Sequence, residues 1–191
     1  MSSSSFSSSS SSETAAEHDA VQEAILIVEQ LAQSMLRDGD LRSWAYLILQ
    51  WNLISRKCNI QDIHFNFVRW SHDMMTNLFC HTKTQHGTRK DVQKFHLSAN
   101  SLRPWICPVT AVSLLMMESN HDGRSLFEST AAATNYTKAF DKALNDPLVE
   151  AALRKSGTKK EDVQSHSIRK SAATYAAGGT TAPPAVFSIL L

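Results

Sequence analysis

The chain has 191 residues and nearly balanced charge, with 19 lysines and arginines against 18 aspartates and glutamates. This length suits one domain with extensions, and no stretch approaches the roughly 20 apolar residues that a membrane-spanning helix needs. The three cysteines form neither a disulfide framework nor a paired metal motif, so we expect a nuclear or cytoplasmic protein rather than a secreted one.

The balanced total conceals an uneven distribution of charge. Residues 13–40 contain seven acidic residues and one basic residue, a balance of −6, whereas residues 41–191 carry 18 basic and 11 acidic residues, a balance of +7. A basic segment suits a polyanionic partner. Taken alone, however, ordinary surface charge is the simpler explanation of these numbers.

The first forty residues divide into two segments. Residues 1–12 are nearly all serine and cannot bury enough apolar surface to become ordered, so we expect a disordered tail. Residues 13–40 follow, in which apolar side chains recur at helical spacing from Thr14 to Leu36 and acids crowd the start. This pattern predicts an acidic N-terminal helix, which Asp38-Gly39-Asp40 ends.

Residues 41–191 are expected to form one domain that is mainly α-helical with a small antiparallel β-sheet, an α+β fold. Partly alternating apolar patterns predict three strands, at 63–68, 74–81 and 92–97. Apolar residues at helical spacing predict further helices, at 41–58, 108–118, 135–144, 147–155 and 168–177.

Four side chains stand in contexts that fit one site. Arg56 ends the segment Trp-Asn-Leu-Ile-Ser-Arg after an apolar helix, and Lys83 lies in a polar turn after the second strand. His166 and Arg169 are three residues apart near the start of the last helix, which places both on one face. An imidazole that handles protons beside a guanidinium that matches phosphate geometry suits phosphate-ester chemistry.

Each of these residues also has an ordinary structural explanation. Arg56 suits a helix C-terminus, where a cation interacts favourably with the helix dipole, and Lys83 suits a solvated turn. His166 fits a capping or surface position, and Arg169 fits a surface ion pair. Only the order and context of all four together favour a shared site.

Together these motifs resemble the catalytic domain of tyrosine recombinases, the phage-integrase-like enzymes, and in detail the Crypton-type branch. The likeness covers about residues 41–191. It includes Trp-Asn-Leu-x-x-Arg ending at Arg56, the hairpin Lys83, Ile-Cys-Pro ahead of a helix at Pro108, and His-Ser-x-Arg-Lys from His166.

The resemblance implies DNA recombination or integration, in which a tyrosine attacks the scissile phosphodiester and the strands are later rejoined. It implies double-stranded DNA and further copies of the chain as partners, with no cofactor, no metal, no membrane and no small-molecule substrate. By match, Arg56 and Arg169 would clamp the non-bridging phosphate oxygens. Lys83 would protonate the leaving oxygen, and His166 would hydrogen-bond the phosphate.

The sequence departs from the family pattern near its end. In the family a Gly-Trp or Gly-His element and the nucleophilic tyrosine follow the helix after a Pro-Pro pair, and neither is found here. Tyr175 lies only six residues after Arg169 and on a different side of the helix, so we expect it to be a packing residue. We therefore expect a C-terminally truncated catalytic domain without a nucleophile.

Two other functions stay open. A non-catalytic DNA-binding module would keep the basic cleft and bind DNA in a salt-dependent way. A helical protein-interaction domain would use the acidic helix over 14–36, and scattered positions of the four site residues would favour it. A zinc site is not expected from the histidines and cysteine between 64 and 86, because their spacing lacks paired ligand motifs.

Overall fold

The computed structural model describes residues 10–71, 74–79, 93–118, 125–127 and 131–177. Within them the fold is mainly α-helical with one three-stranded antiparallel sheet, as the sequence predicts. The helices are α1 (Ser10–Arg37), α2 (Leu41–Asn52), α3 (Lys57–Gln61), α4 (Pro108–Glu118), α5 (Ala132–Ala143), α6 (Pro147–Lys155) and α7 (Ser167–Ala177). The strands are β1 (Val68–Ser71), β2 (Met74–Phe79) and β3 (Gln93–Ser98).

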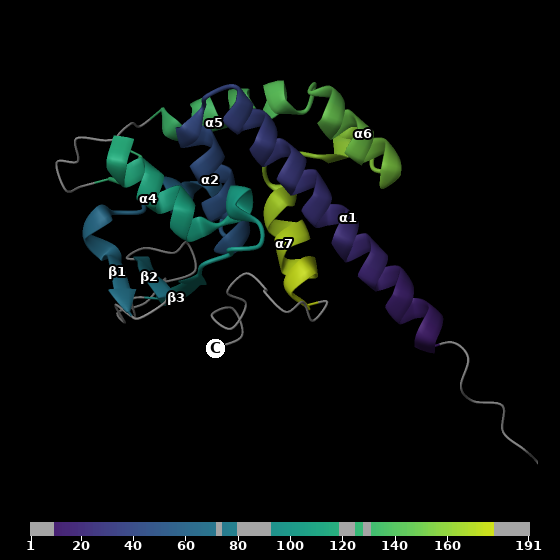
Figure 1. Cartoon of the computed structure of the whole chain (residues 1–191), viewed down its shortest axis with the longest axis horizontal. Coiled ribbons are helices and arrows are strands. Elements are labelled where there is room, and N and C mark those ends of the chain that lie inside the picture. The colour runs from purple at the N-terminus through teal and green to yellow at the C-terminus, as the bar shows by residue number, and fades with distance from the viewer. Residues whose placement is uncertain (1–9, 72–73, 80–92, 119–124, 128–130, 178–191) are drawn as a thin grey trace, which may run out of the picture.

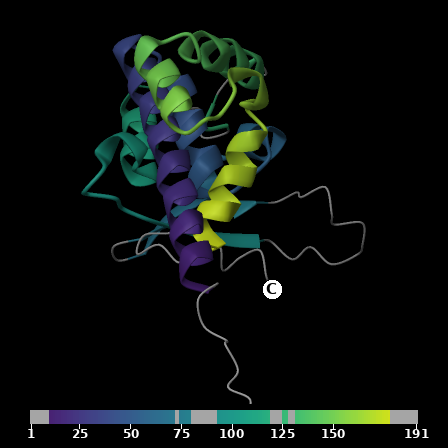
Figure 2. The same ribbon diagram turned by 90° about the vertical axis from the view of Figure 1, so that its right-hand side faces the viewer.

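The long helix α1 is part of the domain core. It runs diagonally across the molecule, and α7 lies beside it in both views (Figure 1, Figure 2). Its apolar stripe, including the fully buried Leu31 and Ala32, packs against α2, α5, α6 and α7. The helix begins at Ser10 and so includes the last three residues of the expected disordered tail. The described part of this stripe, from Ile25 to Met35, therefore belongs to the hydrophobic core.

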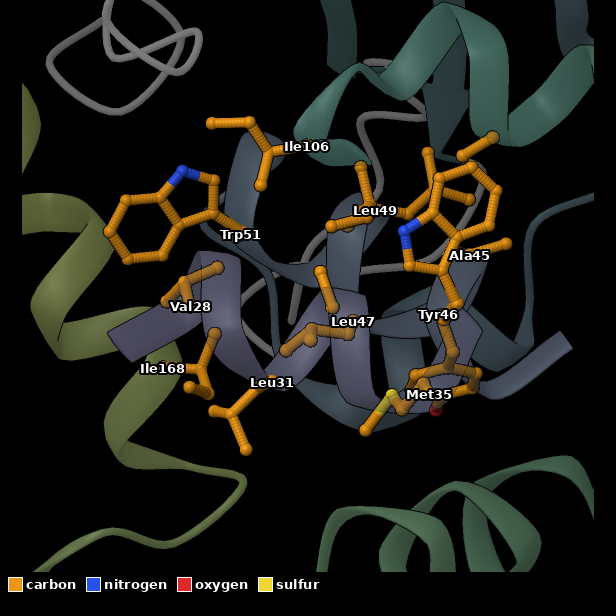
Figure 3. Packing of buried hydrophobic residues seen from close by; sticks show 14 of the residues in the cluster. Val28, Leu31, Met35, Ala45, Tyr46, Leu47, Leu49, Trp51, Ile106 and Ile168 are labelled. Carbon is orange, nitrogen blue, oxygen red and sulfur yellow. The ribbon is translucent and has the colours of Figure 1, made fainter. Parts of the chain in front are cut away.

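Helix α2 lies at the centre of the fold. It begins after Asp40, whose side chain accepts a hydrogen bond from the backbone N–H of Ser43 at 3.0 Å and so caps the first turn. Residues 43–51 are buried without interruption, because α1, α4, α5 and α7 all pack against this helix. Figure 3 shows Leu47 of α2 near Leu31 of α1, and Trp51 on the side facing α7. The core therefore fixes the C-terminal end of α2 firmly.

The helix predicted over 41–58 is interrupted, which corrects the sequence interpretation. It ends at Asn52, where the N–H groups of Ile54 and Ser55 donate to the carbonyls of Trp51 and Gln50 at 3.2 Å each. These two bonds form a Schellman motif, which normally has glycine at the left-handed position. Here Ile54 takes that position with φ +49°, at a cost of about 1–2 kcal/mol.

The sheet has the order β1-β2-β3, and Figure 1 shows it below α4. Its second and third strands lie within two residues of the predicted ones, and the buried pair Met75 and Leu97 face each other across them. The first strand is later than predicted, because residues 65–67 form a 3₁₀ turn and β1 follows at Val68. The predicted hairpin lysine, Lys83, lies outside the described residues.

The remaining helices follow the predicted boundaries closely. Helix α4 begins at Pro108 as expected, and α6 begins at Pro147 after Asp146, whose side chain accepts from the N–H of Leu148 at 2.8 Å. Among the described helices, none has the length and apolarity needed to cross a membrane. In the same part of the chain, no cluster of three or more His, Cys, Asp or Glu side chains offers a metal site.

Candidate functional site

A pocket of about 680 Å³ opens between the end of α2, the start of α3 and the first turns of α7. Its described lining consists of Gln50, Arg56, Lys57, Cys58, His166, Arg169, Lys170 and Ala173. Three of the four predicted site residues, Arg56, His166 and Arg169, therefore share one pocket although Arg56 is far from the other two along the chain. Lys83 lies outside the described residues, so its position relative to the pocket stays a prediction.

The pocket is strongly basic. Four of its described lining residues are lysine or arginine and a fifth is His166, whereas none of them is acidic. Clustered like charges in a concave surface raise the local positive potential and attract anions. The size is within the range of small-ligand sites, so the pocket has room for an anionic group of a larger molecule.

One side of the pocket is the α2–α3 arm, residues 53–58. The Schellman turn at Ile54 redirects the backbone so that Arg56 is extended, with φ −73° and ψ 153°, as the residue before α3. The hydroxyl of Tyr46 donates to the carbonyl of Lys57, and the Lys57 Nζ donates to Thr137 Oγ1 at 3.1 Å. Burial raises the pKa of Tyr46 well above its usual value, which keeps this hydroxyl protonated as a donor.

The other side is the α7 arm, residues 165–170. The Gln50 Nε2 donates to the carbonyl of Ser165 at 2.8 Å, and the Tyr136 hydroxyl donates to Gln50 Oε1 at 2.9 Å. Buried Ile168 anchors the helix to the core. His166, directly before α7, and Arg169, in its first turn, are both exposed on the pocket side.

A single hydrogen bond between described residues joins the two arms directly. The Arg169 Nε donates to the carbonyl of Ile54 at 2.9 Å, so the left-handed residue presents its carbonyl to the guanidinium. This bond uses Nε and leaves the two terminal nitrogens for a ligand. Among the described residues, neither Arg169 nor Arg56 has an acidic partner. An ordinary surface ion pair therefore does not explain either arginine in this part of the chain.

None of the three tyrosines of the chain lines the pocket. Tyr46 and Tyr136 are buried and their hydroxyls donate to Lys57 and Gln50. Tyr175 is only 9% exposed, and its ring lies 5.6 Å from that of Trp51. Tyr175 is thus a packing residue, as predicted, and no tyrosine described here is placed to attack a bound phosphate.

Several lining residues escaped the sequence interpretation. Lys57 and Lys170 directly follow the two predicted arginines, and this adjacency in the sequence is the signal that could have identified them as lining residues. Gln50 gave a subtler signal, since it is a long polar side chain within the apolar run of α2. Such a residue either faces solvent or has a buried polar partner, and Gln50 is 1% exposed.

Comparisons with known proteins found no match among family models, curated proteins or solved structures. The pocket brings two guanidinium groups and one imidazole together.

Proposed function

We propose that this chain is a tyrosine-recombinase-type domain whose pocket binds a phosphodiester of double-stranded DNA. The observation that supports the proposal is the shared pocket of Arg56, His166 and Arg169. These are the residues that the resemblance assigns to the scissile phosphate, and they come from separate parts of the chain. A helical interaction domain is less favoured, because scattered positions of these residues would have supported it.

The chemistry of the pocket suits a phosphodiester. The guanidinium of Arg56 and the terminal nitrogens of Arg169 can each offer paired N–H donors to non-bridging oxygens. His166 adds a further donor, while Lys57 and Lys170 add positive charge. Such preorganised donors stabilise the extra negative charge that develops when a phosphodiester is attacked. In the proposed site, Lys83 would protonate the leaving oxygen.

We propose DNA binding without covalent cleavage by the tyrosines of this chain. Strand cleavage of the recombinase type forms a bond between a tyrosine oxygen and phosphorus while the bond to the 5′ oxygen breaks. The three tyrosine hydroxyls are absent from the pocket lining, so the residues present supply the phosphate-binding part of a recombination or integration site. This observation favours a DNA-binding module as the present activity.

Fluorescence anisotropy with a labelled duplex tests the binding proposal. Affinity should fall with salt, because each neutralised phosphate contributes about −0.9 to the slope of log K against log salt concentration. Arg56→Ala should weaken binding by about 10-fold and reduce the slope. The control Lys138→Ala removes an exposed cation of α5 outside the described pocket lining and should change affinity by less than about twofold. A salt-independent affinity would contradict the proposal.

A nicked DNA substrate, which traps a covalent intermediate, tests the proposal that the tyrosines of this chain do not cleave DNA. Incubation with the full chain followed by denaturing electrophoresis should show no protein–DNA adduct. A trapped adduct that disappears in Tyr175→Phe would show that this tyrosine leaves its packed position and reaches the phosphate. That result would restore a catalytic function.

A further inference from the structure

Gln50 is connected to both sides of the pocket. Its backbone carbonyl accepts the Ser55 N–H at 3.2 Å within the α2–α3 arm, immediately before Arg56. Its side chain donates to the carbonyl of Ser165 at 2.8 Å, immediately before His166. Gln50 is 1% exposed and also lines the pocket.

We propose that Gln50 is a positioning residue that fixes His166 relative to Arg56, and that Tyr136 orients the Gln50 amide. The inference deepens the proposed function and rests on it for the identity of the bound group. The geometry of the Gln50 hydrogen bonds does not depend on the proposed function, because the free protein already has it.

The direction of the Gln50 amide follows from its partners. The carbonyl of Ser165 can only accept a hydrogen bond, so the amide must turn Nε2 toward it and Oε1 toward Tyr136. The Tyr136 hydroxyl then donates at 2.9 Å. Burial raises the pKa of Tyr136 well above its usual value, which keeps that hydroxyl protonated. The amide therefore has one orientation in which both partners are satisfied.

Packing alone does not explain a glutamine at this place. The eight other residues of the uninterrupted buried run 43–51 are mostly large apolar side chains, and an unbranched methionine would fill the same space. A buried amide is costly unless its hydrogen bonds are made. Both bonds of the Gln50 side chain go to groups far along the chain, and one of them holds the backbone next to His166.

The test uses Gln50→Met and Tyr136→Phe, which keep side-chain volume and remove only hydrogen-bonding atoms. Nuclear magnetic resonance of the free full chain should show shifted signals for the His166 amide and imidazole in both variants. Affinity for a duplex should fall about 3- to 10-fold in Gln50→Met. The control Val149→Ala, at a fully buried site on α6, should lower stability yet leave the His166 signals and the affinity unchanged.

A double-mutant cycle separates positioning from general stability. In a His166→Ala background, Gln50→Met should change affinity by less than about twofold, because the group that it positions is gone. Equal losses in both backgrounds, or unshifted His166 signals in Gln50→Met, would overturn the inference. If the His166 signals shift while the unmodified chain shows no salt-dependent DNA binding, the positioning role stands and the proposed function fails.

Discussion

The two sides of the pocket are held in different ways. The path of the α2–α3 arm is set by hydrogen bonds within the last turn of α2, where Ile54 takes a left-handed conformation. The bonds between Tyr46 and Lys57 and between Lys57 and Thr137 then hold the arm beyond that turn. The α7 arm is held by long-range bonds from buried side chains of α2 and α5, chiefly Gln50 and Tyr136. Arg56 thus follows directly after a strained left-handed turn, whereas His166 is held by hydrogen bonds from buried side chains of the core.

The pocket thus combines a strained backbone turn on one side with an arm anchored to the rigid core on the other. A β-branched residue at positive φ is an outlier that persists only where surrounding structure over-determines it. At Ile54 that structure includes its burial, at 3% exposure, and the hydrogen bond from Arg169. The strained turn and the anchored arm therefore meet at one hydrogen bond. Substitutions in each arm should give different results.

Arg169→Ala should have the largest effect, because Arg169 is part of the α7 arm and also donates a hydrogen bond to the α2–α3 arm. The change removes a phosphate-binding guanidinium and the hydrogen bond to Ile54, so duplex affinity should fall about 10- to 100-fold. Arg169→Lys should recover only part of this loss, since an ammonium cannot reproduce the planar fork. Anisotropy titrations of both variants beside Arg56→Ala provide the measurement. A smaller loss of duplex affinity in Arg169→Ala than in Arg56→Ala would contradict the role of Arg169 as the residue that connects the two arms.

At position 54, the glycine variant should be more stable than the alanine variant, which reverses the usual order. At φ +49° alanine is strained and glycine is not, so Ile54→Gly should be more stable than Ile54→Ala by about 1 kcal/mol. At Ile60, buried inside α3, alanine should instead be more stable than glycine by about 0.5–1 kcal/mol. Urea unfolding of the four variants measures both differences. The same order at both positions would contradict a strained turn in the α2–α3 arm.

A smaller, pH-dependent effect should appear in a region that belongs to neither arm. Burial alone would raise the pKa of Asp146, but hydrogen bonds from Arg37, Leu148 and Ser34 lower it below its usual value of 3.8; the Arg37 contact is 2.6 Å. The folded state therefore favours the charged carboxylate, and this stabilisation is present above the unfolded pKa and disappears as pH falls through the folded pKa.

Asp146→Asn should consequently flatten the acid side of the stability profile and leave duplex affinity unchanged, because Asp146 does not line the pocket. Urea unfolding between neutral and acidic pH, with anisotropy at neutral pH, measures the two properties. A change of affinity in this variant would mean that the pocket depends on the α1–α6 contact and not on its two arms alone.

The sequence predicts much of the fold because apolar periodicity and caps are local signals. Pro108 and Pro147 mark the starts of two helices correctly. The break at Ile54 could not be predicted, since the usual glycine signal is absent and core packing imposes the turn. The core role of α1 was also missed, because its acidic surface suggested an extension while its apolar stripe did not identify the buried partner.

The candidate site could be predicted only in part. His166 and Arg169 share a face because of helical spacing, which is a local property. No local pattern brings Arg56 to them, and only the resemblance to a family implies a shared site; in the structure all three line one pocket. The contribution of Gln50 depends on contacts with residues 86 and 115 positions away along the chain. Such long-range hydrogen bonds leave no periodic pattern in a single sequence.

In the proposed site, Arg56, His166 and Arg169 bind one phosphodiester together. The most direct measurement is a nuclear magnetic resonance titration that follows the Nε–H signals of both arginines and the imidazole signals of His166 as duplex DNA is added at low salt. All three sets of signals should shift along one binding curve while the Lys138 amide signal stays in place. Separate midpoints for Arg56 and Arg169, or a response from only one of them, would contradict a shared phosphate.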